Sequence, residues 1–162
     1  MRFVEGTLDM ITNLFLKGRL RHDLSDAEKQ ALEDAVETTI ELEPRKTIVK
    51  RGERIENSYF IVEGAMLRHL DDSKGERQLV GINVSGDFVD LHGFPMKRPD
   101  HSVGALGRTI LAKVPHKAIA DLVDKFPHLA RAMWFSTLLD AATHREWIFR
   151  LGRLNALDRR VG

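Results

Sequence analysis

The stretch Tyr59-Phe60-Ile61-Val62-Glu63-Gly64 carries the clearest signal of the fold, because a short β-prone run ends there at a glycine. Similar runs lie on both sides of it, each bounded by turn residues. The runs are Thr38 to Leu42, Thr47 to Lys50, Tyr59 to Val62, Met66 to Leu70, Gln78 to Asn83 and Thr109 to Val114. Turn glycines at spacings of about ten residues are typical of antiparallel sandwiches and rolls. The sequence therefore predicts a mainly β fold, an antiparallel β-roll of the jelly-roll type, with flanking helices.

Helical patterns precede this β region. Thr7 to Lys17 has apolar residues at helical spacing, and Gly18 follows as the expected stop. Ser25 and Glu28 have the spacing of a capping box, in which each side chain bonds to the other residue's backbone amide. A second helix is therefore predicted to begin after Ser25.

Two further helices are expected after the β region. Pro115 ends the last run, and His116 to Lys125 has the apolar spacing of a short helix. From His128 to about Arg150 the chain holds neither proline nor glycine. This predicts one long helix, which Gly152 is expected to break.

The long predicted helix carries more apolar surface than a single contact requires. One stripe recurs at spacings close to a coiled-coil seam and consists of Trp134, Leu138, Ala141 and Ile148. The neighbouring stripe consists of Phe135, Leu139, Ala142 and Phe149. We expect one face to pack on the roll, and the first stripe, together with Arg145, to form a two-fold homodimer interface. The alternative is a helix buried wholly within one chain, whose solvent edge is marked by Arg131, Asp140, His144 and Arg150.

Composition limits the classes of function. A chain of 162 residues suffices for one domain with a sizeable core. The 25 Lys and Arg against 24 Asp and Glu give a net charge of +1, which is no overall basic signature for nucleic acid. The lack of cysteine excludes disulfides, thiolate zinc sites and cysteine-ligated iron–sulfur clusters. No apolar run is long enough to span a bilayer, so we expect no membrane partner and a cytoplasmic location.

Several landmarks, taken in order, carry a resemblance over nearly the whole chain. They are Arg51-Gly52-Glu53, Tyr59 to Gly64, Gly86-Asp87-Phe88, and His144-Arg145-Glu146-Trp147 running into Leu151-Gly152-Arg153. Together they resemble the effector domain of the catabolite-activator (CRP/FNR) family of bacterial transcription regulators. The resemblance implies a cyclic-nucleotide-binding-like effector domain over residues 1–126 and a dimerisation helix over 127–151. Residues 152–162 would begin a helix-turn-helix domain.

In that family the helix-turn-helix domain reads DNA as a dimer. DNA is therefore expected as a partner only through a C-terminal domain that this sequence lacks. We expect the sequence to be the first part of a longer protein, and natural loss of the DNA-binding half is the alternative.

The resemblance also implies a ligand pocket, formed by Gly86, Asp87, Leu91, His92, His101 and Ser102. In the family a Glu holds the ribose, and an Arg followed by Ser or Thr clamps the cyclic phosphate. Leu91 and His101 occupy those two positions here. Leu91 accepts no hydrogen bond, and histidine lacks the paired donors and permanent charge of arginine. We therefore expect no cofactor and no standard cyclic AMP site.

Other occupants of the pocket stay open. His92 could take the place of the Glu, His101 could become protonated when an anion binds, or Lys97 and Arg98 could supply the cation. The pocket could instead bind an unknown small-molecule effector that is neutral or apolar, or no ligand.

His92 and His101 also raise the possibility of a metal site, because cupins use histidine ligands on a related jelly roll. The two histidines are nine positions apart, and no third ligand has a suitable spacing, so no metal is expected. No serine has the context of a catalytic nucleophile, and no enzyme activity is expected. The sequence predicts the sensor and dimerisation part of a CRP/FNR-like transcription regulator. The alternative is a stand-alone small-molecule-binding module that acts through protein contacts without DNA.

Overall fold

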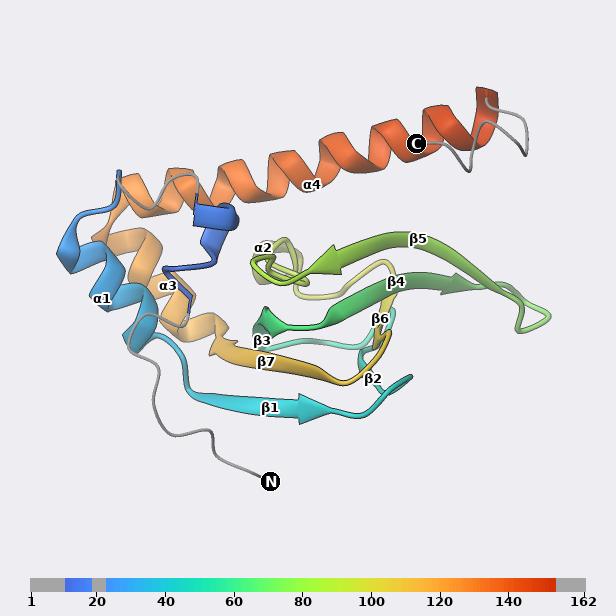
Figure 1. Ribbon diagram of the computed structural model, residues 1–162, viewed down its shortest axis with the longest axis horizontal. Helices are drawn as coiled ribbons and strands as arrows, with labels where there is room; N and C mark the ends of the chain where they lie inside the picture. The colour runs from blue at the N-terminus through green and yellow to red at the C-terminus, as the bar shows by residue number, and fades with distance from the viewer. Residues whose placement is uncertain (1–10, 19–22, 154–162) are drawn as a thin grey trace.

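Two antiparallel sheets face each other in the computed structural model, which describes residues 11–18 and 23–153 (Figure 1). The strands are β1 (Thr38–Leu42), β2 (Thr47–Val49), β3 (Asn57–Glu63), β4 (Ala65–Asp71), β5 (Arg77–Val84), β6 (Ser102–Ala105) and β7 (Thr109–Pro115). One sheet has the order β1-β7-β3 and the other β2-β6-β4-β5. The predicted antiparallel roll with flanking helices is confirmed, and each predicted run corresponds to a strand. Strand β6 was not predicted.

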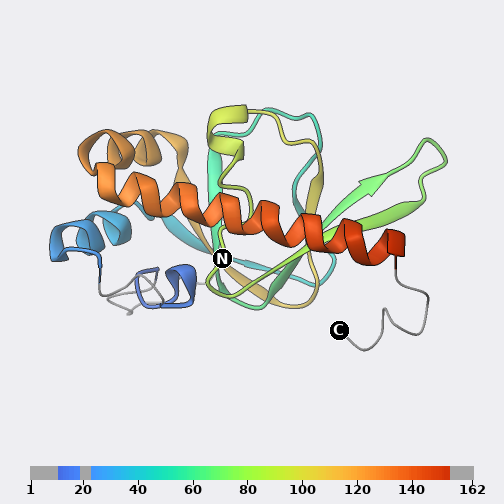
Figure 2. The same cartoon turned by 90° about the horizontal axis from the view of Figure 1, so that it is seen from above.

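The helices gather at one end of the roll and along one side. They are a 3-10 turn at Phe15–Gly18, α1 (Asp26–Asp34), α2 (Gly93–Met96), α3 (His116–Lys125) and α4 (Pro127–Arg153). The capping box before α1 is confirmed, because the Ser25 amide donates to Glu28 Oε2 at 2.8 Å and the Glu28 amide to Ser25 Oγ at 3.2 Å. Helix α4 begins against α1 and α3 and then runs across the roll (Figure 2).

Two helix predictions were wrong within the described residues. Ile11 to Gly18 forms a turn and a 3-10 segment rather than the end of an α-helix, because Leu16 and Lys17 both adopt left-handed backbone angles. Gly152 does not break α4, which continues through it to Arg153. A helical glycine costs only about 1 kcal/mol relative to alanine, and it ends a helix mainly where it turns left-handed. The predicted helix-turn-helix start lies largely outside the described residues.

The core has two parts. Between the sheets, buried apolar side chains of the strands and of the segment after β5 fill the roll and consist of Val49, Ile61, Met66, Val89, Val103, Ala105 and Leu111. At the helical end, a second cluster joins the sheet to the helices. There Phe60 of β3 packs edge-to-face on Phe88 at 5.1 Å, and Leu129 and Met133 of α4 are buried in the same cluster. The first turns of α4 are therefore anchored to the body of the domain.

Two glycines lie where another part of the chain packs directly against the backbone. Gly64 has a φ of +96°, and a Cβ there would lie 2.8 Å from the carbonyl oxygen of Arg108, so the β3–β4 turn requires glycine. Gly81 of β5 lies under α4, where a Cβ would come within 2.9 Å of His144 Nε2. The His144 side chain of α4 therefore lies directly against the Gly81 backbone.

The outer face of α4 is apolar and exposed. Trp134, Leu138 and Ile148 of the predicted dimer stripe have exposed fractions of 66%, 51% and 71%. The prediction that the neighbouring stripe faces the roll was wrong in part, because Phe135 and Phe149 are also exposed. Polar residues instead occupy much of the face toward the roll, including Asp140 and Thr143. No described helix has the length and apolarity that a bilayer crossing requires.

Candidate functional site

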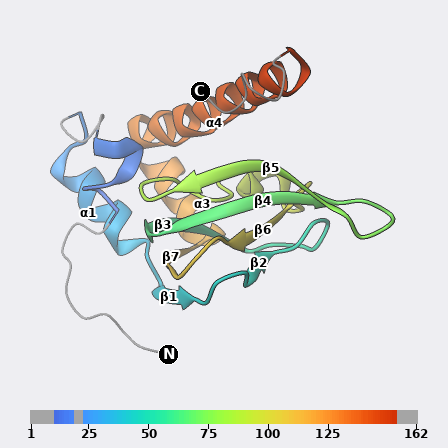
Figure 3. The same ribbon diagram turned by 45° about the vertical axis from the view of Figure 1, so that its right-hand side comes forward.

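A cavity of about 930 Å³ lies between α4 and the β4–β5 side of the roll. Figure 3 shows α4 lying along this side, beyond β5. The apolar part of its wall includes Leu16, Phe88, Leu91, Leu139 and Trp147, and the polar part includes Lys17, Arg68, Asp87, His92, Asp140 and Thr143. Pockets of about 300–1,000 Å³ with a few convergent polar groups are typical of small-molecule sites.

Gly86 and Asp87 of the predicted pocket act mainly in the turn after β5. Gly86 has a φ of +93°, and a Cβ there would lie 2.6 Å from the Leu14 carbonyl oxygen. The Asp87 carboxylate accepts the Val84 amide at 2.9 Å and pairs with Lys17 Nζ at 2.9 Å. These two residues therefore tie the N-terminal turn to the sheet, and Asp87 also lines the cavity.

The other predicted pocket residues divide into two groups. Leu91 and His92 line the cavity, where Leu91 is buried and His92 is partly exposed. His101 is buried inside the roll, and Ser102 Oγ accepts the Arg51 amide at 3.1 Å, so this hydroxyl has a structural bond. His101 and Ser102 are not among the residues that line the cavity.

Lys97 and Arg98, which were considered as substitutes for the missing arginine, contact other groups. Lys97 Nζ lies 3.3 Å from His116 Nδ1 and 4.7 Å from the centre of the Phe94 ring. Arg98 donates to the Gly52 carbonyl oxygen at 2.7 Å. Neither side chain is part of the cavity wall.

Arg68 is a buried cation in the cavity wall, and the sequence did not single it out. Its side chain is only 2% exposed. One guanidinium nitrogen donates to Asp140 Oδ2 of α4 at 2.5 Å, and another donates to the Val89 carbonyl oxygen at 2.6 Å. A register shift between Arg68 and His69 in β4 places both of these side chains in buried positions. The guanidinium thus joins the roll directly to the long helix.

His101 is a poor replacement for an arginine at this place. Burial, and after it the charge of Arg68, lower the pKa of the imidazole below its usual 6.5, although Asp90 and Asp100 act in the opposite sense. A neutral ring supplies no positive charge to a phosphate near neutral pH. The buried carboxylate of Asp90 nearby adds negative charge.

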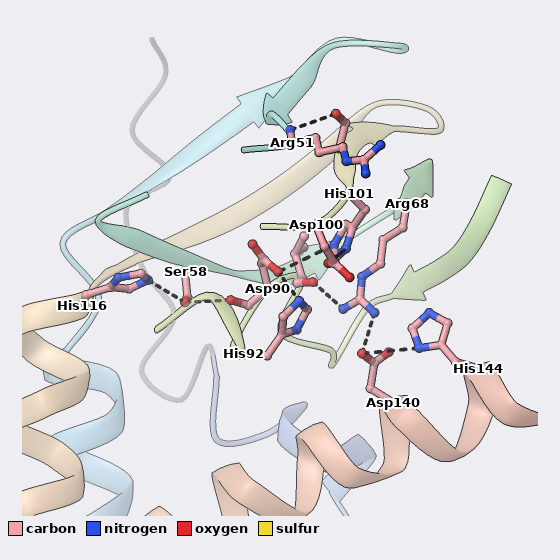
Figure 4. Close-up of polar contacts among 12 residues, drawn as sticks. Arg51, Ser58, Arg68, Asp90, His92, Asp100, His101, His116, Asp140 and His144 are labelled. Carbon is pink, nitrogen blue, oxygen red and sulfur yellow. Dashed lines mark hydrogen bonds and ion pairs between the residues drawn. The ribbon is translucent and has the colours of Figure 1, made fainter. Parts of the chain in front are cut away.

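Asp90, His92 and His101 converge on one point in the structure (Figure 4). His92 Nε2 lies 2.9 Å and His101 Nε2 lies 3.7 Å from Asp90 Oδ1. Asp90 is fully buried, yet neither of its carboxylate oxygens has a hydrogen bond of acceptable geometry. Asp100 Oδ1 lies behind His101, 2.7 Å from its Nδ1. The sequence prediction considered the two histidines but did not identify Asp90 as a third member.

A second buried histidine lies behind this cluster. His116 Nε2 is 3.2 Å from Ser58 Oγ, which donates to the Asp90 carbonyl oxygen. Burial, and then Lys97, lower the pKa of His116 below 6.5, although Glu56 and Asp90 oppose the shift. His116 is therefore a neutral part of the network near neutral pH.

This shift predicts a loss of stability in mild acid. Because the folded-state pKa is depressed, the unfolded chain binds more protons below about pH 6.5, and stability is lost from there down toward the folded-state pKa. We expect the unfolding free energy from urea titrations to fall between about pH 7.5 and about pH 5.5. The fall should be smaller in His116→Phe, which keeps a ring beside Phe94. An equal fall in both proteins would contradict this role of His116.

Comparison with known proteins gives one family and a set of regulators. A family model described as the cyclic nucleotide-binding domain matches residues 39–126. The fumarate and nitrate reduction regulatory protein of Salmonella typhi is 23% identical over 136 residues, which are 84% of this chain and 54% of that protein. The chain thus spans about half the length of the curated relatives it matches.

Solved structures share the fold. The catabolite activator protein of Thermus thermophilus matches with a TM-score of 0.66 and 18% identity, over 83% of this chain and 62% of that one. The regulatory subunit of a cAMP-independent protein kinase A from Trypanosoma cruzi, bound to guanosine, matches with a TM-score of 0.66 and 23% identity, over 88% and 47%.

Proposed function

The chain belongs to the cyclic nucleotide-binding domain family, and on this basis we propose that it is the sensor and dimerisation part of a CRP/FNR-like transcription regulator. The observation that carries the proposal is the ion pair between buried Arg68 and Asp140, at the wall of the cavity. It joins the part of the roll that a ligand would touch to the helix that would transmit a signal.

Signal transfer follows from this geometry. An effector in the cavity touches Leu91 and His92 on one wall and Leu139 and Asp140 on the other. A ligand shifts a conformational equilibrium only as far as it favours one state over the other. A molecule that competes for Arg68, or that wedges between Leu91 and Leu139, favours a different position of α4 relative to the roll. The position of α4 is therefore the output of this module.

The proposed output surface is the outer face of α4. In a homodimer, Trp134, Leu138, Ala141 and Ile148 of two copies, with Arg145 at the edge, would pack along a two-fold axis. DNA contact would come from a separate domain, as in CRP/FNR regulators, and such a regulator would work in the cytoplasm. We propose no catalytic step. A stand-alone module acting through protein contacts is the alternative, and the same coupling supports it.

The effector is proposed to be something other than cyclic AMP. Leu91 offers no acceptor for a ribose hydroxyl, and the neutral ring of His101 stands where the resemblance implies an arginine. Arg68 is already paired with Asp140. The cavity wall instead suits a neutral or largely apolar molecule. A protein kinase regulatory subunit that shares this fold is described as cAMP-independent and bound to guanosine, an uncharged nucleoside, which supports an effector of this kind.

The test restores the Glu and the Arg that the resemblance implies in place of Leu91 and His101. Calorimetry of the wild-type protein with cyclic AMP and cyclic GMP, in the presence of EDTA, should show no saturable binding below about 1 mM. The double variant Leu91→Glu/His101→Arg should bind cyclic AMP at least about tenfold more tightly, because it regains an acceptor and a paired cation. The matched control Leu91→Gln/His101→Lys supplies no carboxylate and no two-pronged donor, and should gain less.

Two results would contradict the proposed pocket. One is wild-type binding of cyclic AMP with a Kd below about 10 μM. The other is a double variant that folds, by circular dichroism, but binds no better than its control. In either case the substitutions at Leu91 and His101 would not explain the ligand preference.

A further inference from the structure

We propose that Asp90, His92 and His101 form a binding site for one divalent transition-metal ion of the Zn²⁺ class. The three residues come from the segment around α2 and from the start of β6, and each offers one ligand atom. Their ligand atoms all lie within 4.8 Å of one another. This inference does not depend on which effector enters the cavity or on whether the chain acts on DNA.

The spacing of the ligand atoms fits such an ion. In a tetrahedral zinc site with bonds of about 2.1 Å, neighbouring ligand atoms are about 3.4 Å apart. The two histidine nitrogens are 2.9 Å and 3.7 Å from Asp90 Oδ1, on either side of that value. Small side-chain rotations bring three ligands onto one ion. Two imidazoles and one carboxylate are a donor set that zinc and ferrous iron both use.

Unsatisfied buried atoms point to a missing cation. Both oxygens of the fully buried Asp90 carboxylate lack a hydrogen bond, and so does His101 Nε2. A buried charge without a partner is costly, and buried charges are usually paired or bound to metals. A metal ion between the three side chains would bind one Asp90 oxygen and His101 Nε2, and would place a positive charge beside the whole carboxylate.

The surroundings of His101 match a metal ligand. Its Nδ1 lies 2.7 Å from Asp100 Oδ1, and the carboxylate can only accept there. The proton therefore sits on Nδ1, and Nε2 carries the free lone pair that faces Asp90. A carboxylate that orients a histidine in this way is the usual second partner of zinc-bound histidines. Asp90 and Asp100 together balance the charge of a divalent ion.

One side of the site is open toward the cavity. His92 is part of the cavity wall, whereas Asp90 and His101 lie deeper. Three protein ligands leave at least one coordination position for water or for an oxygen or nitrogen atom of a small molecule. The ion would then replace, as a positive charge, the arginine that this chain lacks.

The experiment uses Zn²⁺ and Co²⁺ as the only probes. Untagged protein, treated with chelator and then freed of it, is titrated with Zn²⁺ by calorimetry, and its visible spectrum is recorded with Co²⁺. We expect one ion per chain with a Kd of about 1 μM or lower. His92→Ala and Asp90→Asn should each weaken binding by about 100-fold and abolish the Co²⁺ absorption. Asp100→Asn should weaken Zn²⁺ binding by about 10-fold, because it only orients His101.

His144→Ala is the matched control. His144 is a partly exposed histidine with an aspartate, Asp140, at 4.0 Å, but it has no third ligand in the described structure. Its loss should leave the Kd for Zn²⁺ unchanged. His92 is partly exposed, so its variant is expected to fold even if Asp90→Asn does not. A wild-type Kd above about 100 μM for both ions, or binding that His92→Ala retains, would overturn the proposal.

Discussion

Asp140→Ala should lower the unfolding free energy by about 3 kcal/mol, because removal of one partner leaves the other charge buried and unpaired. Arg68 is 2% exposed and would keep only the Val89 carbonyl oxygen as an acceptor. Asp140 itself is 27% exposed, so the loss of unfolding free energy should lie near the lower end of the range for buried ion pairs. The melting temperature of a chain of this size should fall by roughly 6–12 °C. Thermal unfolding followed by circular dichroism measures both quantities.

A double variant that lacks both charges tests whether an unpaired buried charge causes this loss of stability. Arg68→Met/Asp140→Leu removes both charges and fills similar space, so most of the lost stability should return. The control on the same helix is Glu146→Ala, which breaks the exposed pair between Glu146 and Arg150 at 3.0 Å. An exposed pair of this spacing is worth about 0.3–0.5 kcal/mol. If Asp140→Ala costs no more than this control, the roll and α4 are not joined through Arg68.

Leu138→Glu should raise the dissociation constant of the proposed homodimer by at least about 100-fold. At a two-fold axis one substitution places two carboxylates near each other, in a surface that would otherwise exclude water. Leu138 lies between Trp134 and Ala141 in the exposed stripe of α4. Sedimentation velocity over a concentration series would show the wild-type protein as a dimer and the variant as a monomer at about 10 μM.

Leu106→Glu is the matched control for the interface. Leu106 is 56% exposed, close to the 51% of Leu138, but lies in the loop between β6 and β7. The same change of size and charge there should leave the association unchanged. A wild-type protein that sediments as a monomer at about 10 μM would remove the proposed interface. If both variants weaken the dimer equally, the added negative charge itself, rather than its position on α4, causes the weaker association.

Local sequence signals predicted most of the architecture. The run from Tyr59 to Gly64 became a strand ending at a left-handed glycine, and the Ser25 and Glu28 spacing became a complete capping box. These features depend on residues near one another in sequence, where backbone preference and hydrogen bonding act directly. Strand β6 was missed because Val103-Gly104-Ala105 is short and contains a glycine, and its strand character comes from pairing with β2 and β4.

The site was predicted less well, because its contacts join distant segments. Arg68 and Asp140 are 72 residues apart, and nothing local marks either residue as buried or paired. Asp140 was expected at a solvent edge only in the alternative of a helix buried within one chain, and the structure places it toward the roll. Nothing local marks Asp90 as a ligand, and only the fold brings its carboxylate close to both His92 and His101. A metal had been considered unlikely for want of the third ligand that the structure supplies.

The contact between Gly81 and His144 lies partway along α4, beyond the turns that are anchored in the core. The first turns of α4 are held at Leu129 and Met133, and Gly81 of β5 lies beneath His144, about 16 Å further along the helix axis from Met133. Arg153 is about 30 Å from Met133 along the same axis. If α4 pivots as a rigid rod about these first turns, a displacement at His144 nearly doubles at Arg153. A side chain at position 81 that displaced the helix at His144 would therefore move the end of α4 by almost twice that displacement.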